Sequence, residues 1–131
     1  MTIQFADLGI DQDLVEVLSE RGITTPFDIQ SLTIPDGLAG RDVCGKAKTG
    51  SGKTLAFGIP LIQRLPRGTP KRPTGLVLVP TRELAVQVCK ELEPLAEARG
   101  LRIEAIYGGT PIEKQIAALT SGVDFVVATP G

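Results

Sequence analysis

Residues 47–54 read Ala-Lys-Thr-Gly-Ser-Gly-Lys-Thr, and no other stretch of the chain constrains the fold as strongly. A short apolar segment, Asp42–Cys44, precedes this stretch, and a run with helical character, Leu55–Ile59, follows it. Glycines allow successive backbone N–H groups to turn inward, and a helix N-terminus adds a positive dipole. A strand, a glycine-rich loop and a helix in this order therefore predict a phosphate-binding loop. The general pattern begins with glycine, and Ala47 departs from it at that one position.

Two residues close this phosphate loop and carry its chemistry. Lys53 is placed to reach the outer phosphates of a nucleotide, and the hydroxyl of Thr54 is placed to hold Mg²⁺. An ordinary flexible turn is the alternative, but Gly-Lys-Thr at the start of a helix favours a nucleotide site. The other loop residues expected to surround the phosphates are Ala47, Lys48, Thr49, Gly50, Ser51 and Gly52.

The composition is that of one modest globular domain. The chain has 131 residues, two cysteines and no histidine, so neither a metal site nor a disulfide framework is indicated. No apolar run approaches the ~20 residues that a membrane helix needs, and the N-terminus lacks a secretory signal. We therefore expect a cytoplasmic protein that does not contact a membrane.

Charge is distributed unevenly around a net value of −1. Residues 1–45 carry eight acidic and two basic side chains, whereas residues 46–131 carry seven acidic and twelve basic ones. Chance variation on solvated faces is one explanation. The other is that any surface that binds phosphate groups belongs to the second part.

Strand-like and helix-like segments alternate after the phosphate loop. Apolar runs at Leu76–Val79, Ile103–Tyr107 and Phe125–Val127 predict strands, with helical patterns between them. This alternation is typical of an α/β fold with a parallel sheet and right-handed crossovers. A continuous apolar run is typical of a strand covered on both faces, so we expect Leu76–Val79 to be buried.

The expected helices have their own start and stop signals. In the leader, one helix should be capped by Asp11 and end at Gly22, and a second should be capped by Asp28 and stop or kink at Pro35. The helix after the phosphate loop should run to about residue 65. Two later helices should each turn one apolar face inward, formed by Leu84, Val88, Leu92 and Leu95 in one and by Ile112, Ile116 and Leu119 in the other.

Parallel α/β sheets bind their ligands at the carboxyl ends of the strands. Each polar or glycine-rich motif after residue 45 follows a predicted strand: the phosphate loop, Pro80–Glu83, Gly108-Gly109 and Thr129–Gly131. The carboxyl ends of parallel strands meet at one edge of a sheet. We therefore expect these motifs to form a row of phosphate contacts along that edge.

Together these motifs resemble the first RecA-like domain of the DEAD-box ATP-dependent RNA helicases. The resemblance covers essentially the whole chain, with the motifs in the family's order. Gly22–Gln30, with Phe5 seventeen residues upstream of its first glycine, looks like the Q motif. Pro80–Ala85 is similar to motif Ia, Gly108-Gly109 to the family's paired glycines, and Thr129–Gly131 to the start of motif Ib. The family's phosphate loop usually begins with alanine, which accounts for Ala47.

The resemblance implies ATP and Mg²⁺ as cofactors. It implies that the amide of Gln30 pairs with the Hoogsteen edge of adenine, that Phe5 stacks on the base, and that Ile23 lies in the same site. Without the resemblance, Phe5 would be interpreted as a core anchor of the leader and Gln30 as a helix-face amide. Lys53 and Thr54 take the catalytic positions of the loop.

The resemblance also implies contact with the RNA backbone, without readout of its sequence. Arg82 is the central residue, because an arginine against the positive N-terminus of a helix is poorly explained by stability alone. The residues that match the family's RNA-binding motifs are Pro80, Thr81, Arg82, Gly108, Gly109, Thr129, Pro130 and Gly131.

By the same resemblance, residues 1–40 form a Q-motif helical leader, and residues 41–131 form the N-terminal portion of a RecA-like ATP-binding domain. The family's Asp-Glu-Ala-Asp and Ser-Ala-Thr segments and its second RecA-like domain lie outside these residues. The parent protein is therefore expected to be an RNA-dependent ATPase and helicase, while the 131 residues alone are expected to be inactive. The parallel sheet should be incomplete, with an open edge through which the chain could self-associate.

Two other interpretations remain open at this point. One is a non-enzymatic module that binds nucleotide or RNA. The other is a DNA translocase or a small-molecule kinase with the same phosphate loop, which leaves Gly22–Gln30 unexplained. Competition between ATP and GTP separates them, since only the Q-motif interpretation predicts selectivity for adenine.

Overall fold

The computed structural model describes residues 3–48, 52–65, 72–109 and 111–130. The chain forms two compact units, Met1–Arg64 and Leu65–Gly131. The predictions for Thr49, Gly50, Ser51 and Gly131 lie outside the described residues. The first unit extends past residue 40 because the helix that follows the phosphate loop packs on the leader. The expected boundary at residue 40 concerns the sequence motifs and stays a prediction.

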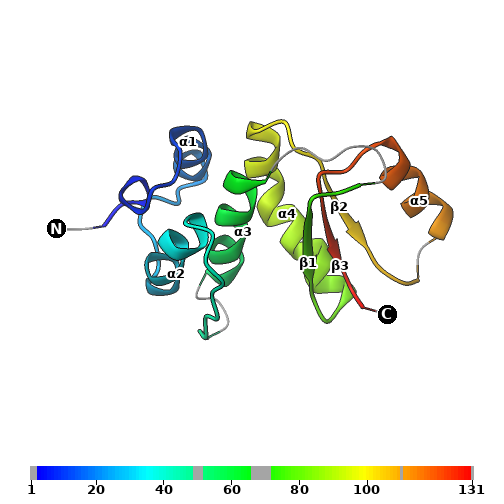
Figure 1. Ribbon diagram of the computed structural model, residues 1–131, viewed down its shortest axis with the longest axis horizontal. Helices are drawn as coiled ribbons and strands as arrows, with labels where there is room; N and C mark the ends of the chain where they lie inside the picture. The colour runs from blue at the N-terminus through cyan, green and yellow to red at the C-terminus, as the bar shows by residue number, and fades with distance from the viewer. Residues whose placement is uncertain (1–2, 49–51, 66–71, 110, 131) are drawn as a thin grey trace. The chain divides into compact units, whose positions relative to one another are not determined.

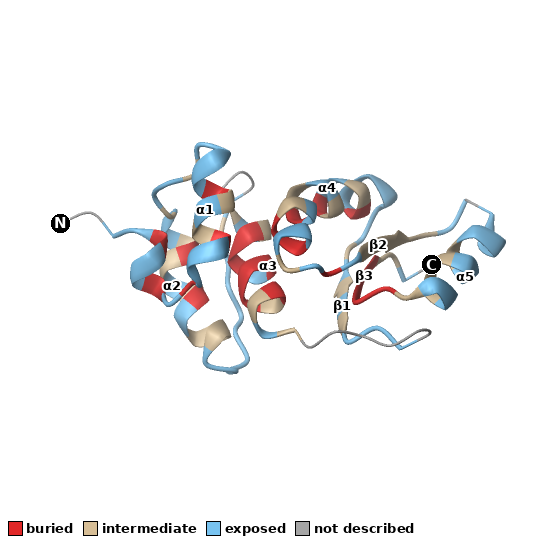
Figure 2. Cartoon of the chain, turned by 90° about the horizontal axis from the view of Figure 1, so that it is seen from above, coloured by how far each residue is buried: buried red, intermediate tan, exposed pale blue. Residues whose placement is uncertain are grey.

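The first unit is helical (Figure 1). A short 3-10 helix, η1 (Phe5–Leu8), is followed by α1 (Gln12–Glu20), α2 (Asp28–Leu38) and α3 (Lys53–Arg64). Figure 2 shows buried residues gathered on these helices. Those with at most 2% exposure are Phe5, Leu14, Leu18, Gln30, Ile34, Ile59 and Ile62. Each apolar side chain buried in this way contributes roughly 1.5–3 kcal/mol of transfer free energy.

The two leader helices differ from expectation at Asp11 and Asp28, and of the two expectations for Pro35 the stop is not seen. Helix α1 ends as predicted, with Gly22 in the left-handed region at φ +76°. Asp11 precedes α1, but its carboxylate makes no capping hydrogen bond. Asp28 is the first residue of α2 and not its cap, and the helix continues through Pro35 to Leu38.

Packing explains why Pro35 fails to stop α2. A proline removes one donor from the helical ladder, which favours a break only where nothing holds the two halves together. Here α2 lies against α3 on both sides of the proline. Ile34 is fully buried, and a Cβ at Gly37 would lie 3.0 Å from the ring of Pro60 on α3. The contact between the two helices therefore outweighs the lost hydrogen bond.

The strand predicted at Asp42–Cys44 is absent, and this prediction is wrong. Residues 41–46 are exposed and form no regular element. A strand requires a neighbouring strand for its backbone hydrogen bonds. Among the described residues of the first unit there is no strand for this segment to pair with.

The second unit contains a three-stranded parallel sheet, which confirms the predicted α/β class. Its strands are β1 (Gly75–Leu78), β2 (Ile103–Ile106) and β3 (Phe125–Ala128), arranged in the order β1-β3-β2. Helices α4 (Arg82–Ala98) and α5 (Ile112–Ser121) connect them. The two crossovers run in opposite directions across the sheet, so right-handed connections place the helices on opposite faces, as Figure 1 shows.

Asp124 holds the amino ends of the three strands together. Its Oδ2 accepts the N–H of Arg102, at the start of β2, at 2.7 Å. Its backbone carbonyl accepts the N–H groups of Thr74 and Gly75, at the start of β1, at 2.8 and 3.2 Å. The side chain is only 7% exposed, and these contacts satisfy a polar group that would otherwise be costly to bury.

One face of the sheet is closed, and the other is only partly covered: Val126 of the central strand is buried on it, at 8% exposure. Phe125 and Val127 point toward α4 and are fully buried, together with Val88 and Leu92 of that helix at 4% or less. On the opposite face Leu76 and Leu78 are each 62% exposed, so the prediction of a buried first strand is wrong. The cause is that none of the described elements covers this part of the face. Self-association through this edge stays a prediction.

Helix α5 also contradicts the predicted burial. It has no buried residue, and Ile112 and Ile116 are 64% and 56% exposed, while Leu119 is half-buried. In α4 the predicted face is correct except for Leu84, which is 38% exposed; Ala85 takes its place in the core. The helical spacing identified these helices, but it could not show that part of each apolar face has no partner in the described fold.

The two thiols should differ sharply in reactivity. Cys44 is exposed, whereas burial, with Glu104 and Glu93 nearby, raises the pKa of Cys89 from 9.0 to about 11. The raised pKa lowers the thiolate fraction of Cys89 at any pH below it, and only the thiolate reacts. We expect iodoacetamide at mildly alkaline pH to modify Cys44 faster by on the order of tenfold or more. Peptide mass mapping measures both rates, and equal rates would contradict the burial of Cys89.

Candidate nucleotide site and nucleic-acid edge

Gln30 joins the predicted Q motif to the predicted phosphate loop. Its Oε1 accepts the backbone N–H of Phe27 at 2.8 Å, and its Nε2 donates to the carbonyl of Gly52 at 3.0 Å. The side chain is 1% exposed. The first bond holds the start of α2, because the N–H of Phe27 precedes the first helical turn. The second fixes the last loop residue before α3.

These two bonds use half of the hydrogen-bonding capacity of the Gln30 amide. A glutamine amide has two donor hydrogens and two acceptor lone pairs, and each of its polar atoms uses one here. One donor and one acceptor remain, which is the complement that the Hoogsteen edge of adenine requires. Adenine recognition by Gln30 stays a prediction, but the intramolecular bonds do not use up the groups that it needs.

The groups predicted to bind phosphate lie at the start of α3. Gly52 adopts φ +83°, a backbone conformation that residues with a side chain rarely adopt. A Cβ at this position would also clash with Nε2 of Gln30. Lys53 is the first residue of the helix and is exposed, while Thr54 is half-buried. The N–H groups of a first helical turn have no intrahelical acceptor, so they point toward whatever binds there. This is the donor set that a phosphate group requires.

Phe5 and Ile23 are placed less simply. Phe5 is 2% exposed within the core of the first unit, so its ring is a core anchor of the leader in this structure. Stacking on adenine stays a prediction that requires the ring to turn out of this core. Ile23 is half-buried, and its N–H donates to the carbonyl of Leu18 at 2.8 Å, which ties the Q-motif segment to α1.

The other predicted motifs gather at the carboxyl edge of the sheet. Pro80 and Thr81 follow β1, Gly108 and Gly109 follow β2, and Thr129 follows the central strand β3. The N–H of Thr129 donates to the carbonyl of Ile106 at 3.1 Å, which extends the pairing of β3 with β2 by one residue. The expected clustering of these motifs within the second unit is confirmed.

Thr81 has a structural role in this edge. Its Oγ1 accepts the N–H of Leu84 at 3.2 Å and caps α4, which contributes ~1 kcal/mol. The cap fixes the start of the helix and therefore the position of Arg82, its first residue. Arg82 is exposed, and its Nη1 lies 2.7 Å from the position that a Cβ on Gly109 would occupy. The motif after β1 thus meets the motif after β2 through one guanidinium group.

Gly109 and Gly108 should respond differently to substitution. Gly109 has φ +87° and faces Arg82, whereas a Cβ on Gly108 would meet nothing within 4 Å. We expect Gly109→Ala to lower the free energy of unfolding by about 1–2 kcal/mol and to displace Arg82. Gly108→Ala is the matched control and should change it by less than about 0.5 kcal/mol. Thermal denaturation followed by circular dichroism checks both, and equal effects would contradict this packing.

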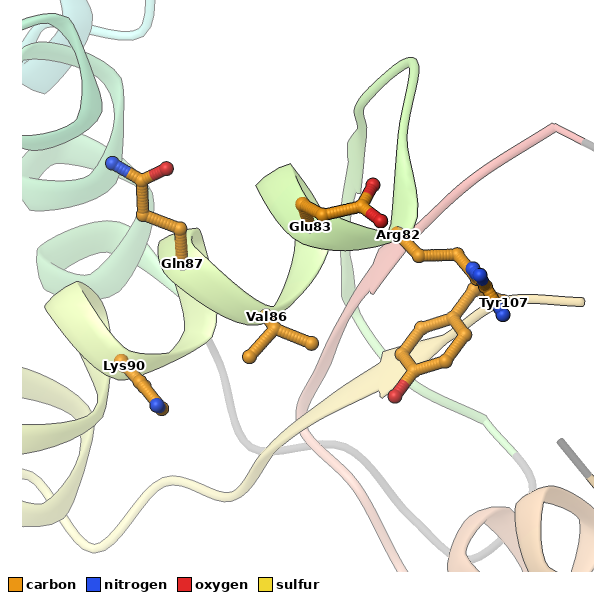
Figure 3. A pocket seen from close by; sticks show the side chains of 6 residues that line it. All are labelled: Arg82, Glu83, Val86, Gln87, Lys90 and Tyr107. Atoms are coloured by element: carbon orange, nitrogen blue, oxygen red, sulfur yellow. The ribbon is translucent and has the colours of Figure 1, made fainter. Parts of the chain in front are cut away.

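Two residues in this region were not identified from the sequence. Gln115 of α5 donates its Nε2 to the carbonyl of Tyr107 at 3.0 Å and accepts the N–H of the same residue at its Oε1 at 3.1 Å. The strand end beyond β2 is thereby held by a side chain in place of a further strand. Tyr107 itself lines a groove of about 620 Å³ beside α4, shown in Figure 3. No short sequence motif identifies Gln115, because it bonds to the backbone N–H and carbonyl of Tyr107, and backbone groups leave no mark on the sequence.

Comparison with known proteins identifies the family. Residues 27–131 match the model of the DEAD/DEAH box helicases. The chain belongs to this family. Its DEAD-box character was predicted from the Q-motif and motif Ia residues, and that prediction is confirmed.

Similar proteins include several named ATP-dependent RNA helicases. The chain is 47% identical to the pre-mRNA-processing ATP-dependent RNA helicase PRP5 of Meyerozyma guilliermondii, covering 100% of this chain and 16% of that protein. It is 44% identical to the DEAD-box ATP-dependent RNA helicase CshA of Bacillus licheniformis, covering 100% and 27%. The chain thus spans about a quarter or less of the length of these two relatives.

Solved structures agree with this assignment. A DEAD box protein from the hyperthermophile Methanococcus jannaschii superposes with a TM-score of 0.90 at 38% identity, over 100% of this chain and 36% of that one. The RNA helicase Prp28 from Chaetomium thermophilum, solved bound to ADP, gives 0.87 at 38% identity over 97% and 32%. The chain therefore has the fold of the N-terminal part of a DEAD-box RecA-like domain.

Proposed function

We propose that this DEAD-box chain is part of an ATP-dependent RNA helicase, in which it binds ATP and one side of the RNA. The family match over residues 27–131 supports the activity class. The bond between Gln30 and Gly52 carries the proposal for the site, because it makes the adenine-recognising residue and the phosphate loop parts of one structure. A cytoplasmic location, favoured by the sequence, is part of the same proposal.

The residues at the start of α3 would hold the nucleotide. The ammonium group of Lys53 would neutralise the outer phosphates, and the hydroxyl of Thr54 would hold Mg²⁺ together with the phosphates themselves. Among the described residues no group of three or more histidine, cysteine or acidic side chains could hold a metal ion. ATP supplies the phosphoanhydride bond; the chain supplies position and charge.

Contacts at the carboxyl edge of the sheet would hold the RNA. Arg82 provides the charge, and the backbones at Gly109 and Thr129 allow a sugar-phosphate chain to approach closely. Contacts of this kind fix the register of a strand without reading its bases. None of the helices among the described residues is long and apolar enough to cross a membrane.

Nucleotide selectivity tests the proposed site. We expect ATP to displace a fluorescent adenine nucleotide from the chain, and GTP to require at least about tenfold higher concentration, since one mismatched hydrogen-bonding edge costs ~1–3 kcal/mol. Gln30→Ala should remove most of this preference. Equal displacement by ATP and GTP in the wild-type chain would exclude Gln30 as the selecting residue.

A further inference from the structure

The aromatic ring of Phe27 lies outside the core of the first unit, and the function proposed above gives it no role. Phe27 immediately precedes α2, and its side chain is 58% exposed. Single exposed apolar side chains are common on protein surfaces, so this exposure alone indicates nothing. What distinguishes Phe27 is the place of its ring.

The ring lies against the last loop residue before α3. A Cβ built on Gly52 would lie 2.8 Å from Cδ2 of Phe27, and it would also clash with Nε2 of Gln30. The ring edge and the Gln30 amide therefore occupy the same side of Gly52, in the space that a side chain there would take. At this separation the ring edge is in van der Waals contact with the Gly52 backbone. Gly52 is thus held by an apolar contact as well as by its hydrogen bond to Gln30.

The ring also borders the beginning of the phosphate loop. Phe27 and Ala47 line one hollow of about 280 Å³, which they share with Lys46 and Leu32. Ala47 is the first residue of the loop, and Gly52 lies near its end. The side chain of Phe27 therefore stands beside both ends of the loop that is predicted to hold the phosphates.

The backbone of Phe27 is anchored independently of this ring contact. Its N–H donates to Oε1 of Gln30 at 2.8 Å, and its carbonyl accepts the N–H groups of Gln30 and Ser31, each at 3.0 Å. These bonds hold the point from which the side chain extends, and the contact with Gly52 gives the place of the ring itself. A site that binds phosphate through backbone N–H groups gains affinity when that backbone is ordered before the ligand arrives.

We propose that Phe27 is a positioning residue for the phosphate loop. Its ring holds Gly52 in the conformation from which the first turn of α3 presents its N–H groups to the phosphates, and it acts through this backbone and not through the base. The inference rests on the proposed nucleotide site and divides the work within the Q-motif segment. Gln30 selects the base, whereas Phe27 orders the loop.

Inorganic tripolyphosphate separates the loop from the base, because it carries the phosphates of ATP without adenine. Phe27→Ala should weaken the binding of tripolyphosphate and of ATP by the same factor. We expect a loss of about 5- to 30-fold, the equivalent of ordering one more backbone residue on binding. Isothermal titration of each ligand in the presence of Mg²⁺ measures the two losses.

Two further variants show whether the contact with Gly52 is responsible. Phe27→Leu keeps an apolar side chain at this position and should bind both ligands within about threefold of the wild type. Leu32→Ala is the matched control. Leu32 lies in the same helix and lines the same hollow, but it is 73% exposed and is not among the neighbours nearest to Gly52. Its removal should change neither affinity by more than about twofold.

The mobility of Gly52 gives a readout that a general loss of stability does not move. In the free chain, the ¹⁵N order parameter of the Gly52 amide should fall in Phe27→Ala from about 0.85, typical of rigid backbone, to below about 0.6. The thermal midpoint should change by no more than about 4 °C, because the ring is mostly exposed. The ratio of ATP to GTP affinity should stay at its wild-type value, because Gln30 is unchanged.

The outcomes distinguish this inference from the function on which it rests. A loss confined to ATP would place the ring on the base and overturn the inference, and so would unchanged affinities for both ligands in Phe27→Ala. Equal affinities of the wild-type chain for ATP and GTP would instead refute adenine recognition, while parallel losses in Phe27→Ala would still support positioning of the loop. A wild-type chain that binds neither ATP nor tripolyphosphate would refute both.

Discussion

Replacing Lys53 with alanine should weaken the binding of ATP to this chain by about 10- to 150-fold. Hydrogen bonds to charged groups contribute ~1.5–3 kcal/mol, and each 1.4 kcal/mol corresponds to a tenfold change in affinity. Lys53 is the first residue of α3 and is exposed, so its side chain contributes little to packing. Isothermal titration with ATP and Mg²⁺ measures the loss, and the thermal midpoint of the free chain should stay nearly constant.

A second lysine shows whether the affinity for ATP depends on the position of Lys53 or only on its positive charge. Lys46 is also exposed and lies seven residues before Lys53, in the segment that leads into the phosphate loop. Lys46→Ala removes the same charge from the same region but not from the start of a helix. It should cost less than about threefold in affinity, as expected of a solvated charge. Equal losses in the two variants would mean that ATP responds to local charge and not to the phosphate loop.

The sequence could predict those parts of the site whose geometry is local. The glycines at 52 and 109 occupy positive φ as turns require, and the motifs after β1, β2 and β3 meet at one edge because parallel strands must align their ends. The family resemblance followed from such motifs and is confirmed by the match over residues 27–131.

What the sequence could not predict depends on partners distant in the chain. The segment at Asp42–Cys44 reads as a strand, yet a strand exists only where another strand pairs with it. Leu76 and Ile112 read as core residues, yet both are more than 60% exposed because nothing described covers them. Burial is a property of the assembled fold, and an apolar pattern states only what a segment is able to bury.

Three glutamines show that the sequence also leaves the distant partners of polar side chains unpredicted. Gln30, Gln63 and Gln115 each use both amide atoms to hold backbone groups of another segment. Their partners lie between three and 54 residues away. No spacing rule marks such residues, because a backbone acceptor carries no side-chain identity. Only the resemblance singled out Gln30, and it did so for adenine binding and not for its bond to Gly52.

Changing Gln30 to glutamate should destabilise the first unit by about 2–4 kcal/mol at neutral pH. The carboxylate keeps an acceptor for the N–H of Phe27 but replaces the donor that bonds to Gly52, so two acceptors meet at 3.0 Å. The site is 1% exposed, and an unpaired buried charge is far costlier than a lost neutral hydrogen bond. Far-UV circular dichroism during thermal and urea denaturation measures this loss.

The pH dependence of this variant identifies the cause. Burial and the facing carbonyl favour the protonated form, so the pKa of the new carboxyl should rise above the ~4.3 of an unfolded glutamate. The folded state then binds more protons than the unfolded state, so stability falls as pH rises through the folded pKa and is recovered on acidification. The protonated carboxyl regains a donor for Gly52.

Gln63→Glu is the matched control, because Gln63 bridges Gly9 and Asp11 through the same pair of bonds, 3.0 and 2.8 Å, at a more exposed site. It should lose about 1 kcal/mol or less, since water can solvate its charge. A Gln30→Glu variant as stable as Gln63→Glu at neutral pH would show that the bridge between the Q-motif segment and the phosphate loop does not hold the first unit together.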